Sequence, residues 1–136
     1  MRMTRPTTLA ALTLAAIAVP SGLIAATAGT ASASATGFGP KKCTPLENGD
    51  LCAAGVSGSP NGYDASYHKV AGSPVTLRFA LECKNGFVKA DNGPFSLIKG
   101  NTGSFVFSVG NQGECRVHMH DYTNGGDFRT PYVTVP

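Results

Sequence analysis

Apolar and polar residues alternate along several short segments of this chain, a period typical of β-strands with one buried face. The clearest segment is VTLRFALEC, residues 75–83, in which every odd-numbered residue is apolar or cysteine. SFVFSV at residues 104–109 and ECRVHMHDY at residues 114–122 alternate in the same way. The pattern therefore predicts three half-buried strands.

Weaker runs predict further strands, and glycine, proline and asparagine separate them as turn signals. These runs are YDASYHKV at 63–70, residues 87–89, FSLIK at 95–99 and FRTPYVTV at 128–135. GVSGSPNG, residues 55–62, is expected to form a loop. No apolar stripe with a helical period follows residue 36. Six to eight short strands without a helix predict an all-β fold, a two-sheet β-sandwich, with a small β-barrel as the alternative.

The first 35 residues predict a secretory signal peptide. Arg2 and Arg5 precede a predominantly apolar run at residues 9–19, and Ala33-Ser34-Ala35 fits an A-x-A cleavage site, with residues 31–33 as the second choice. A retained membrane anchor is the alternative. The run is shorter than the ~20 residues that a bilayer span requires, so we expect no membrane span after cleavage.

Cleavage changes both the length and the charge of the chain. Removing residues 1–35 of the 136 leaves 101 residues, and it takes away two of the 11 Lys and Arg, which leaves 9 against 8 Asp and Glu, a net charge of +1. A nucleic-acid-binding domain carries a clustered basic face, so this class is not expected. We predict a mobile arm at residues 36–42, TGFGPKK, and one extracellular β-domain at residues 43–136.

Four cysteines follow the signal, and in a small exported chain they imply two disulfides with three alternative pairings. A four-residue loop at 46–49, which contains an Asn-Gly turn signal, would place Cys43 opposite Cys52. Cys83 and Cys115 both lie on apolar strand faces. We therefore predict Cys43–Cys52 and Cys83–Cys115, the second pinning two strands across the core.

Residues 114–123, ECRVHMHDYT, concentrate the chemistry of the chain. Alternation turns Cys115 toward the core and places Arg116, His118, His120 and Tyr122 on the opposite, polar face. A Cys/His nucleophile pair needs a reduced thiolate within reach of the imidazole. An oxidised, inward-facing cysteine excludes this arrangement.

The two histidines also fit a metal site. Residues His118 and His120 are two apart on one strand face, with Cα atoms about 6.6–6.8 Å apart, a spacing that suits zinc or copper. His68 would be the third ligand if its strand lay alongside, with Asp64 or Asp127 adding a carboxylate. The alternatives are an ordinary solvent face or a contact patch.

The layout resembles the small secreted proteins common in actinobacteria. The resemblance rests on the export signal ending ASASA, on the four cysteines and on the run SYHKVAGSPVTLRFALEC at residues 66–83. It implies an exported, disulfide-bonded, all-β domain of about a hundred residues. It carries over no activity and no functional residues.

No G-x-S-x-G, H-E-x-x-H or P-loop motif is present, so we expect neither an enzyme nor a cofactor. The favoured function is a non-catalytic binding or adaptor module that contacts another secreted or surface protein, alone or within an exported complex. The candidate contact residues are Arg116, His118, His120 and Tyr122. One alternative is a protease inhibitor with an exposed stapled loop, anchored by Leu46 or Leu51. The loop residues are Leu46, Glu47, Asn48, Gly49, Asp50 and Leu51. The second alternative is a metal-binding protein using His118 and His120.

We predict that the mature protein begins within a few residues of Thr36 and accumulates outside the cell. Intact mass of the protein recovered from culture medium measures the start directly. A mass that includes residues 9–19 would contradict cleavage.

Overall fold

The computed structural model describes residues 37–136, and the predicted signal peptide and Thr36 lie outside them. The described residues form ten strands and no helix. The first sheet consists of β1 (Gly37–Phe38), β2 (Lys42–Leu46), β3 (Gly49–Ser57), β4 (Gly62–Lys69) and β8 (Thr102–Phe107). The second consists of β5 (Val75–Cys83), β6 (Val88–Ala90), β7 (Phe95–Leu97), β9 (Cys115–Asp121) and β10 (Asp127–Arg129).

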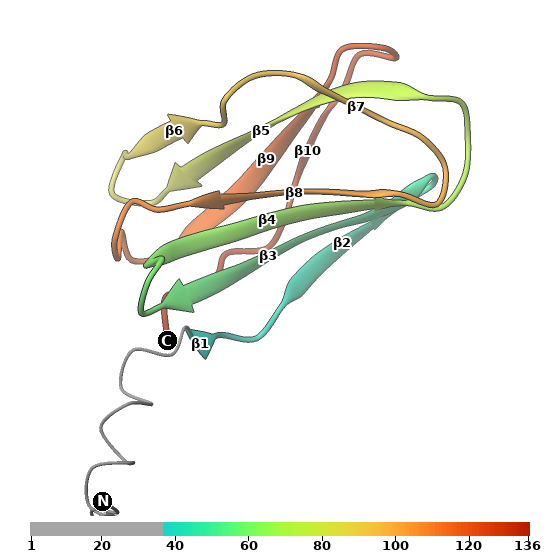
Figure 1. Cartoon of the computed structure of the whole chain (residues 1–136). Helices are drawn as coiled ribbons and strands as arrows, with labels where there is room; N and C mark the ends of the chain where they lie inside the picture. Colours follow the sequence, from blue (N-terminus) through green and yellow to red (C-terminus); the bar gives the residue numbers. More distant parts are fainter. Residues whose placement is uncertain (1–36) are drawn as a thin grey trace, which may run out of the picture. The chain divides into compact units, whose positions relative to one another are not determined.

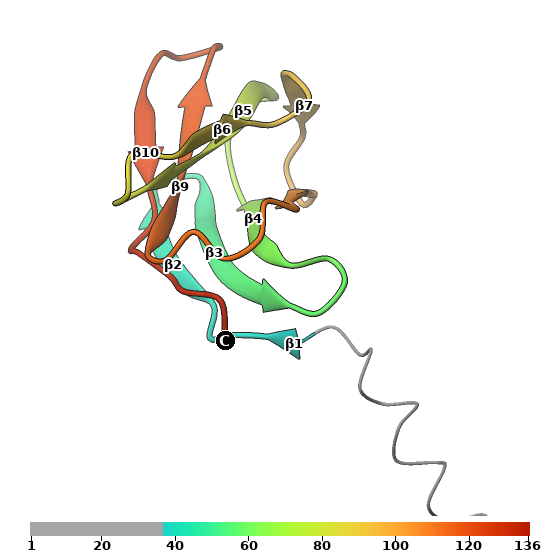
Figure 2. The ribbon, with the colours of Figure 1, turned by 90° about the vertical axis from the view of Figure 1, so that its left-hand side faces the viewer.

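Each sheet is built around one central strand, and all pairings are antiparallel. In the first sheet β3 pairs with β4 on one side and with β1 and β2 on the other, while β8 adds to β4. In the second sheet β5 pairs with β9 on one side and with β6 and β7 on the other, while β10 adds to β9. The sheets face each other as two layers in a sandwich-like arrangement (Figures 1 and 2), so the all-β, two-sheet prediction is confirmed.

The core lies between the inward faces of the two sheets. Side chains of β5 and β9 alternate between buried and half-buried along their whole length, as the sequence predicted. Phe79 and Val117 are completely buried, and burying one such side chain contributes about 1.5–3 kcal/mol. From the facing sheet, Tyr63 is also completely buried, and its hydroxyl donates a 2.6 Å hydrogen bond to the Gly113 carbonyl.

Strand β3 runs through part of the segment that was predicted to be a loop. It continues to Ser57, and residues 51–56 are all buried. The C-terminal segment crosses the inward side of β3, the side of Leu51 and Ala53, so closely that a Cβ on Gly55 would collide with the Thr134 carbonyl oxygen. A strand covered on both faces carries no alternation, and close backbone approach selects small residues. The loop prediction at 55–62 is therefore wrong up to Ser57.

The N-terminal arm of the domain is not free either. β1 pairs with the end of β3, with Gly37 opposite Ser57, and the Gly39 amide donates a 2.8 Å hydrogen bond to the Gly55 carbonyl. The prediction of a mobile arm is wrong for residues 37–42. Backbone pairing holds this stretch without any apolar side-chain pattern, which is why its composition gave no sign of it.

The remaining predicted strands begin and end within two residues of their observed bounds, except at the C-terminus. There β10 ends at Arg129, and the chain rejoins the sheet only through a single bridge between Val133 and Cys115. Pro131 lies between them and cannot donate a ladder hydrogen bond.

Both predicted disulfides are present, Cys43–Cys52 and Cys83–Cys115, each with Cα atoms 4.0 Å apart. Each joins directly opposite residues of adjacent antiparallel strands. Cys83–Cys115 therefore fixes two neighbours within one sheet rather than crossing the core, which corrects the prediction. The β2–β3 connection is also tighter than predicted: Leu46 pairs with Gly49, so only two residues form the turn.

The two disulfides suit an oxidising environment. No helix among residues 37–136 has the length and apolar character needed to cross a membrane.

We expect the double Cys83→Ala, Cys115→Ala variant to lose more stability than Cys43→Ala, Cys52→Ala. The bonds span sequence separations of 32 and 9. On the chain-entropy account their removal costs at most about 3.7 and about 2.7 kcal/mol, because the longer loop restricts the unfolded chain more. Urea unfolding at neutral pH measures both differences. A larger loss in the Cys43, Cys52 variant would contradict this order.

Candidate functional site

Ionisable side chains cluster around the predicted contact residues on the outward side of the second sheet. Directly opposite residues on paired strands share a face. Arg116 lies opposite Glu82, His118 opposite Arg129, and His120 opposite both Arg78 and Asp127. We call this surface the outer face. It comprises Arg78, Glu82, Arg116, His118, His120, Tyr122, Asp127 and Arg129.

Asp127 joins the two histidines. Its Oδ1 atom lies 2.6 Å from His118 Nε2 and 2.9 Å from His120 Nδ1. The hydrogen bonds from His120 and His118 lower the pKa of the Asp127 carboxyl below its ordinary value. The carboxylate thus fixes the orientation of both imidazole rings on the surface.

Glu82 is a second hub on the same face. Arg129 Nε lies 3.0 and 3.1 Å from its two carboxylate oxygens, and Arg116 Nη2 lies 3.5 Å from Oε2. Glu82 Oε1 is also 3.6 Å from His118 Nδ1. His118 therefore lies between two carboxylates, and among residues 37–136 its ring nitrogens contact these carboxylates and no thiol or hydroxyl.

Aromatic rings lie at two places on this surface. Tyr122, 51% exposed, meets the His120 ring edge-on with centroids 4.5 Å apart. Tyr132, from the C-terminal segment, lies under the Arg116 guanidinium at 5.0 Å and under the Lys84 ammonium at 4.7 Å. Cationic groups over an aromatic ring are attracted by its quadrupole. The face thus combines aromatic, cationic and imidazole groups.

Charges on and beside the outer face cancel. Arg78 pairs with Asp91 at 3.1 Å, and Arg116 and Arg129 share Glu82. With Asp127 included, three guanidinium groups meet three carboxylates, a formal charge of zero with neutral imidazoles. Protonating both histidines would make the face positive.

Sequence reasoning placed Arg116, His118 and His120 on one polar face, and the half-buried pattern along β9 agrees. It did not assign Arg129, Tyr132 or Glu82 to this face. Their membership follows from cross-strand register and from the path of the C-terminal segment. Neither leaves a local signal in the sequence.

Of the further metal ligands proposed, Asp127 lies beside both histidines, whereas His68 and Asp64 lie elsewhere. His68 and Asp64 belong to β4 in the other sheet, and His68 Nδ1 is 2.8 Å from Thr102 Oγ1. Their assignment as ligands beside His118 and His120 is therefore wrong. Across residues 37–136, no group of three or more His, Cys, Asp or Glu side chains is placed to hold a metal ion.

The candidate inhibitory loop is a tight hairpin. Leu51 is completely buried, and Leu46 packs against the core from its edge. Glu47 and Asp50 are exposed. The hairpin therefore offers a protease acidic side chains rather than the leucine anchor that the inhibitor hypothesis required.

Comparison of the chain with protein-family models, curated proteins and solved structures finds no match. The interpretation of the outer face therefore depends on its geometry.

The lowered pKa of Asp127 predicts a defined pH dependence for the Asp127→Asn variant. A depressed folded-state pKa gives stability that is present above the ordinary value of 3.8 and is lost as pH falls through the folded-state pKa. At neutral pH the variant should unfold at lower urea concentration than the unmodified protein. Below pH 3.8 this difference should shrink.

Asp50→Asn is the matched control, because the Asp50 side chain is exposed and has no ion pair or hydrogen bond with any described residue. A difference between Asp127→Asn and the unmodified protein that stays constant across the acid range would show that the Asp127–histidine contacts contribute nothing to stability.

Proposed function

We propose that this protein is a secreted, non-catalytic binding module that contacts another extracellular protein through the outer face, alone or as a subunit of an exported complex. The observation that carries the proposal is the ordered polar surface around Asp127 and Glu82. Four cationic or imidazole side chains contact these two carboxylates: Arg116, His118, His120 and Arg129.

Preorganisation supports a docking role. Ordering a flexible side chain at an interface costs about 0.5–1.5 kcal/mol, and side chains already held by neighbours avoid much of this cost. His118 and Arg116 are held in this way, with side chains that are 21% and 32% exposed. A partner would meet a surface with a fixed shape and fixed hydrogen-bonding groups.

Tyr122 is the best candidate for an anchor. Tyrosine and arginine are enriched among the residues that dominate interface energies. The Tyr122 ring is 51% exposed and is already oriented by His120. A partner that covers it gains apolar burial without having to order a mobile ring.

Secretion is supported by the basic and apolar pattern of residues 1–35 and by two disulfides, which persist in oxidising compartments. The absence of a nucleophile beside His118 supports a binding role rather than a hydrolytic one.

Recovery of a partner from culture supernatant, identified by mass, tests the proposal. For that partner, Tyr122→Ala and Arg116→Ala should each weaken binding by more than about tenfold, since truncating an anchor costs about 2 kcal/mol or more.

The matched control for the histidine contribution compares His120→Ala with His68→Ala, an exposed histidine on the opposite sheet. Only the first should weaken binding. Unchanged affinity in Tyr122→Ala and Arg116→Ala would remove the outer face as the contact surface. Stoichiometric zinc or copper in protein purified without a His-tag, lost in the His118→Ala, His120→Ala variant, would replace protein contact with metal binding.

A further inference from the structure

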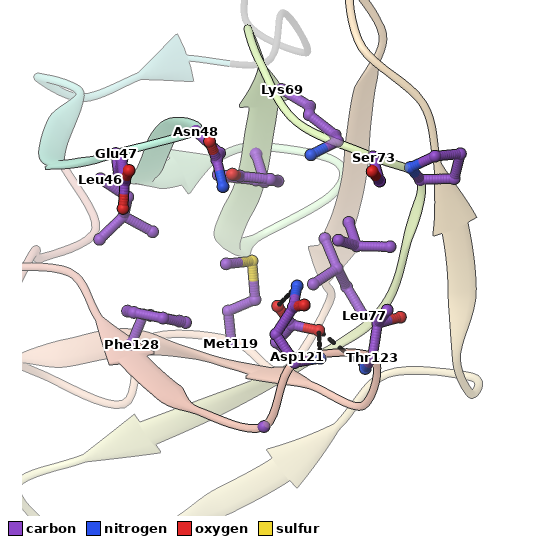
Figure 3. Close-up of a pocket in the computed structure, with 15 residues that line it drawn as sticks. Leu46, Glu47, Asn48, Lys69, Ser73, Leu77, Met119, Asp121, Thr123 and Phe128 are labelled. Carbon is purple, nitrogen blue, oxygen red and sulfur yellow. Dashed lines mark hydrogen bonds between the residues drawn. The ribbon is translucent and has the colours of Figure 1, made fainter.

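A pocket of about 420 Å³ opens between the two sheets at one end (Figure 3). Three connections that are distant in sequence border it: the β2–β3 turn, the segment between β4 and β5, and the β9–β10 turn. Its volume falls within the ~300–1,000 Å³ of small-molecule sites. Its apolar lining is Leu46, Val75, Leu77, Met119 and Phe128.

The Lys69 side chain lines this pocket, and its ammonium group uses only one of its hydrogen-bond donors. Its side chain is 1% exposed, and its Nζ donates one hydrogen bond, 2.6 Å, to the Ala71 carbonyl. An ammonium group has three donors. The Lys69 ammonium forms no ion pair with any described residue. Burying a charge without an opposite charge is costly. The Nζ atom lies near the Asn48 amide, because a Cβ on Gly72 would be 3.2 Å from both groups.

Tyr67 supplies a second unused donor. It is 4% exposed and lines the pocket, yet its hydroxyl makes no hydrogen bond with any residue in the described range. Burial, followed by the negative charges of Asp121 and Asp50, raises the pKa of this phenol. The hydroxyl therefore keeps its proton and lacks an acceptor.

The acidic groups in the lining set a limit on ligand charge. Burial opposes ionisation of Asp121, but hydrogen bonds from Asn124 and Thr123 outweigh it and lower the pKa of this carboxyl. Its oxygens accept from the backbone amides of Thr123 and Asn124 at 2.8 and 3.0 Å and from Asn124 Nδ2 at 3.1 Å. Glu47 lies exposed at the mouth. Both carboxylates disfavour a second negative charge on a ligand.

We infer that this pocket binds a small organic acid with one carboxylate and a compact apolar body. The carboxylate accepts hydrogen bonds from the Lys69 ammonium and the Tyr67 hydroxyl, and the apolar body lies against Leu77, Met119 and Phe128. The inference is independent of protein contact at the outer face, because none of these residues belongs to that face.

Isothermal titration calorimetry of the exported protein, with both disulfides intact, tests the inference with three related probes. Hydrocinnamate has one carboxylate, hydrocinnamamide is its neutral counterpart, and benzylmalonate adds a second carboxylate to the same body. Hydrocinnamate should bind saturably, and the other two should bind at least about tenfold more weakly, because a hydrogen bond to a charged group is worth more than one to a neutral group. Chemical-shift changes at the Met119 and Leu77 methyl groups should accompany binding.

Two variants with matched controls locate the donors. Lys69→Met keeps the length of the buried stem and should weaken hydrocinnamate at least about tenfold, whereas Lys99→Met, at an exposed lysine, should not. Tyr67→Phe should weaken it severalfold, and Tyr122→Phe should leave it unchanged. If Lys69→Met does not fold, Tyr67→Phe and the probe series still decide the question. Absence of saturable hydrocinnamate binding, equal binding of the amide, or full affinity in Tyr67→Phe would overturn the inference.

Discussion

The pairing of β5 with β9 is the constraint on which both the core and the outer face depend. Seven residue pairs run from Leu77 opposite Asp121 to Cys83 opposite Cys115. This register turns Phe79 into the core and presents His118 outward. A slip of one residue would exchange the two faces, because side chains alternate with a period of two. The disulfide at one end of the pair holds the register against such a slip, so one covalent bond protects the packing and the surface chemistry together.

Charged side chains are paired with one another on the outer face, whereas the pocket contains hydrogen-bond donors without a protein acceptor. On the outer face, carboxylates, guanidinium groups and imidazoles are paired with one another. Exposed pairs of this kind add little to stability, so their main effect is to fix orientation. In the pocket, Lys69 is almost completely buried and its ammonium donates one hydrogen bond, to the Ala71 carbonyl, while the Tyr67 hydroxyl donates none to a described residue. A ligand that supplies an acceptor can therefore use donors that the protein leaves open.

The pocket lies among three turns, each of which is held in place by its own contacts. The β2–β3 hairpin needs only two turn residues and leaves Leu46 at the edge of the core. Asp121 organises the β9–β10 turn by accepting hydrogen bonds from its backbone. The Lys69 ammonium, at the end of β4, donates a hydrogen bond to the Ala71 carbonyl and so holds the segment that follows β4. Each contact has a local structural role, and together they frame an opening lined by apolar side chains.

The sequence by itself determined the strands whose two faces differ, because alternation reports directly which side chains are buried. β5, β9 and the Cys83–Cys115 bond follow from that pattern, as does the polar side of β9, while Cys43–Cys52 follows from the spacing around the Asn-Gly turn. Tertiary structure decided what alternation does not encode. β3 is covered on both faces, β1 is held by backbone hydrogen bonds, and the partners of His118 come from β5 and β10. The pocket likewise joins Lys69 to Met119 across the two sheets. Such contacts depend on register and on the path of distant segments, which no local run of residues records.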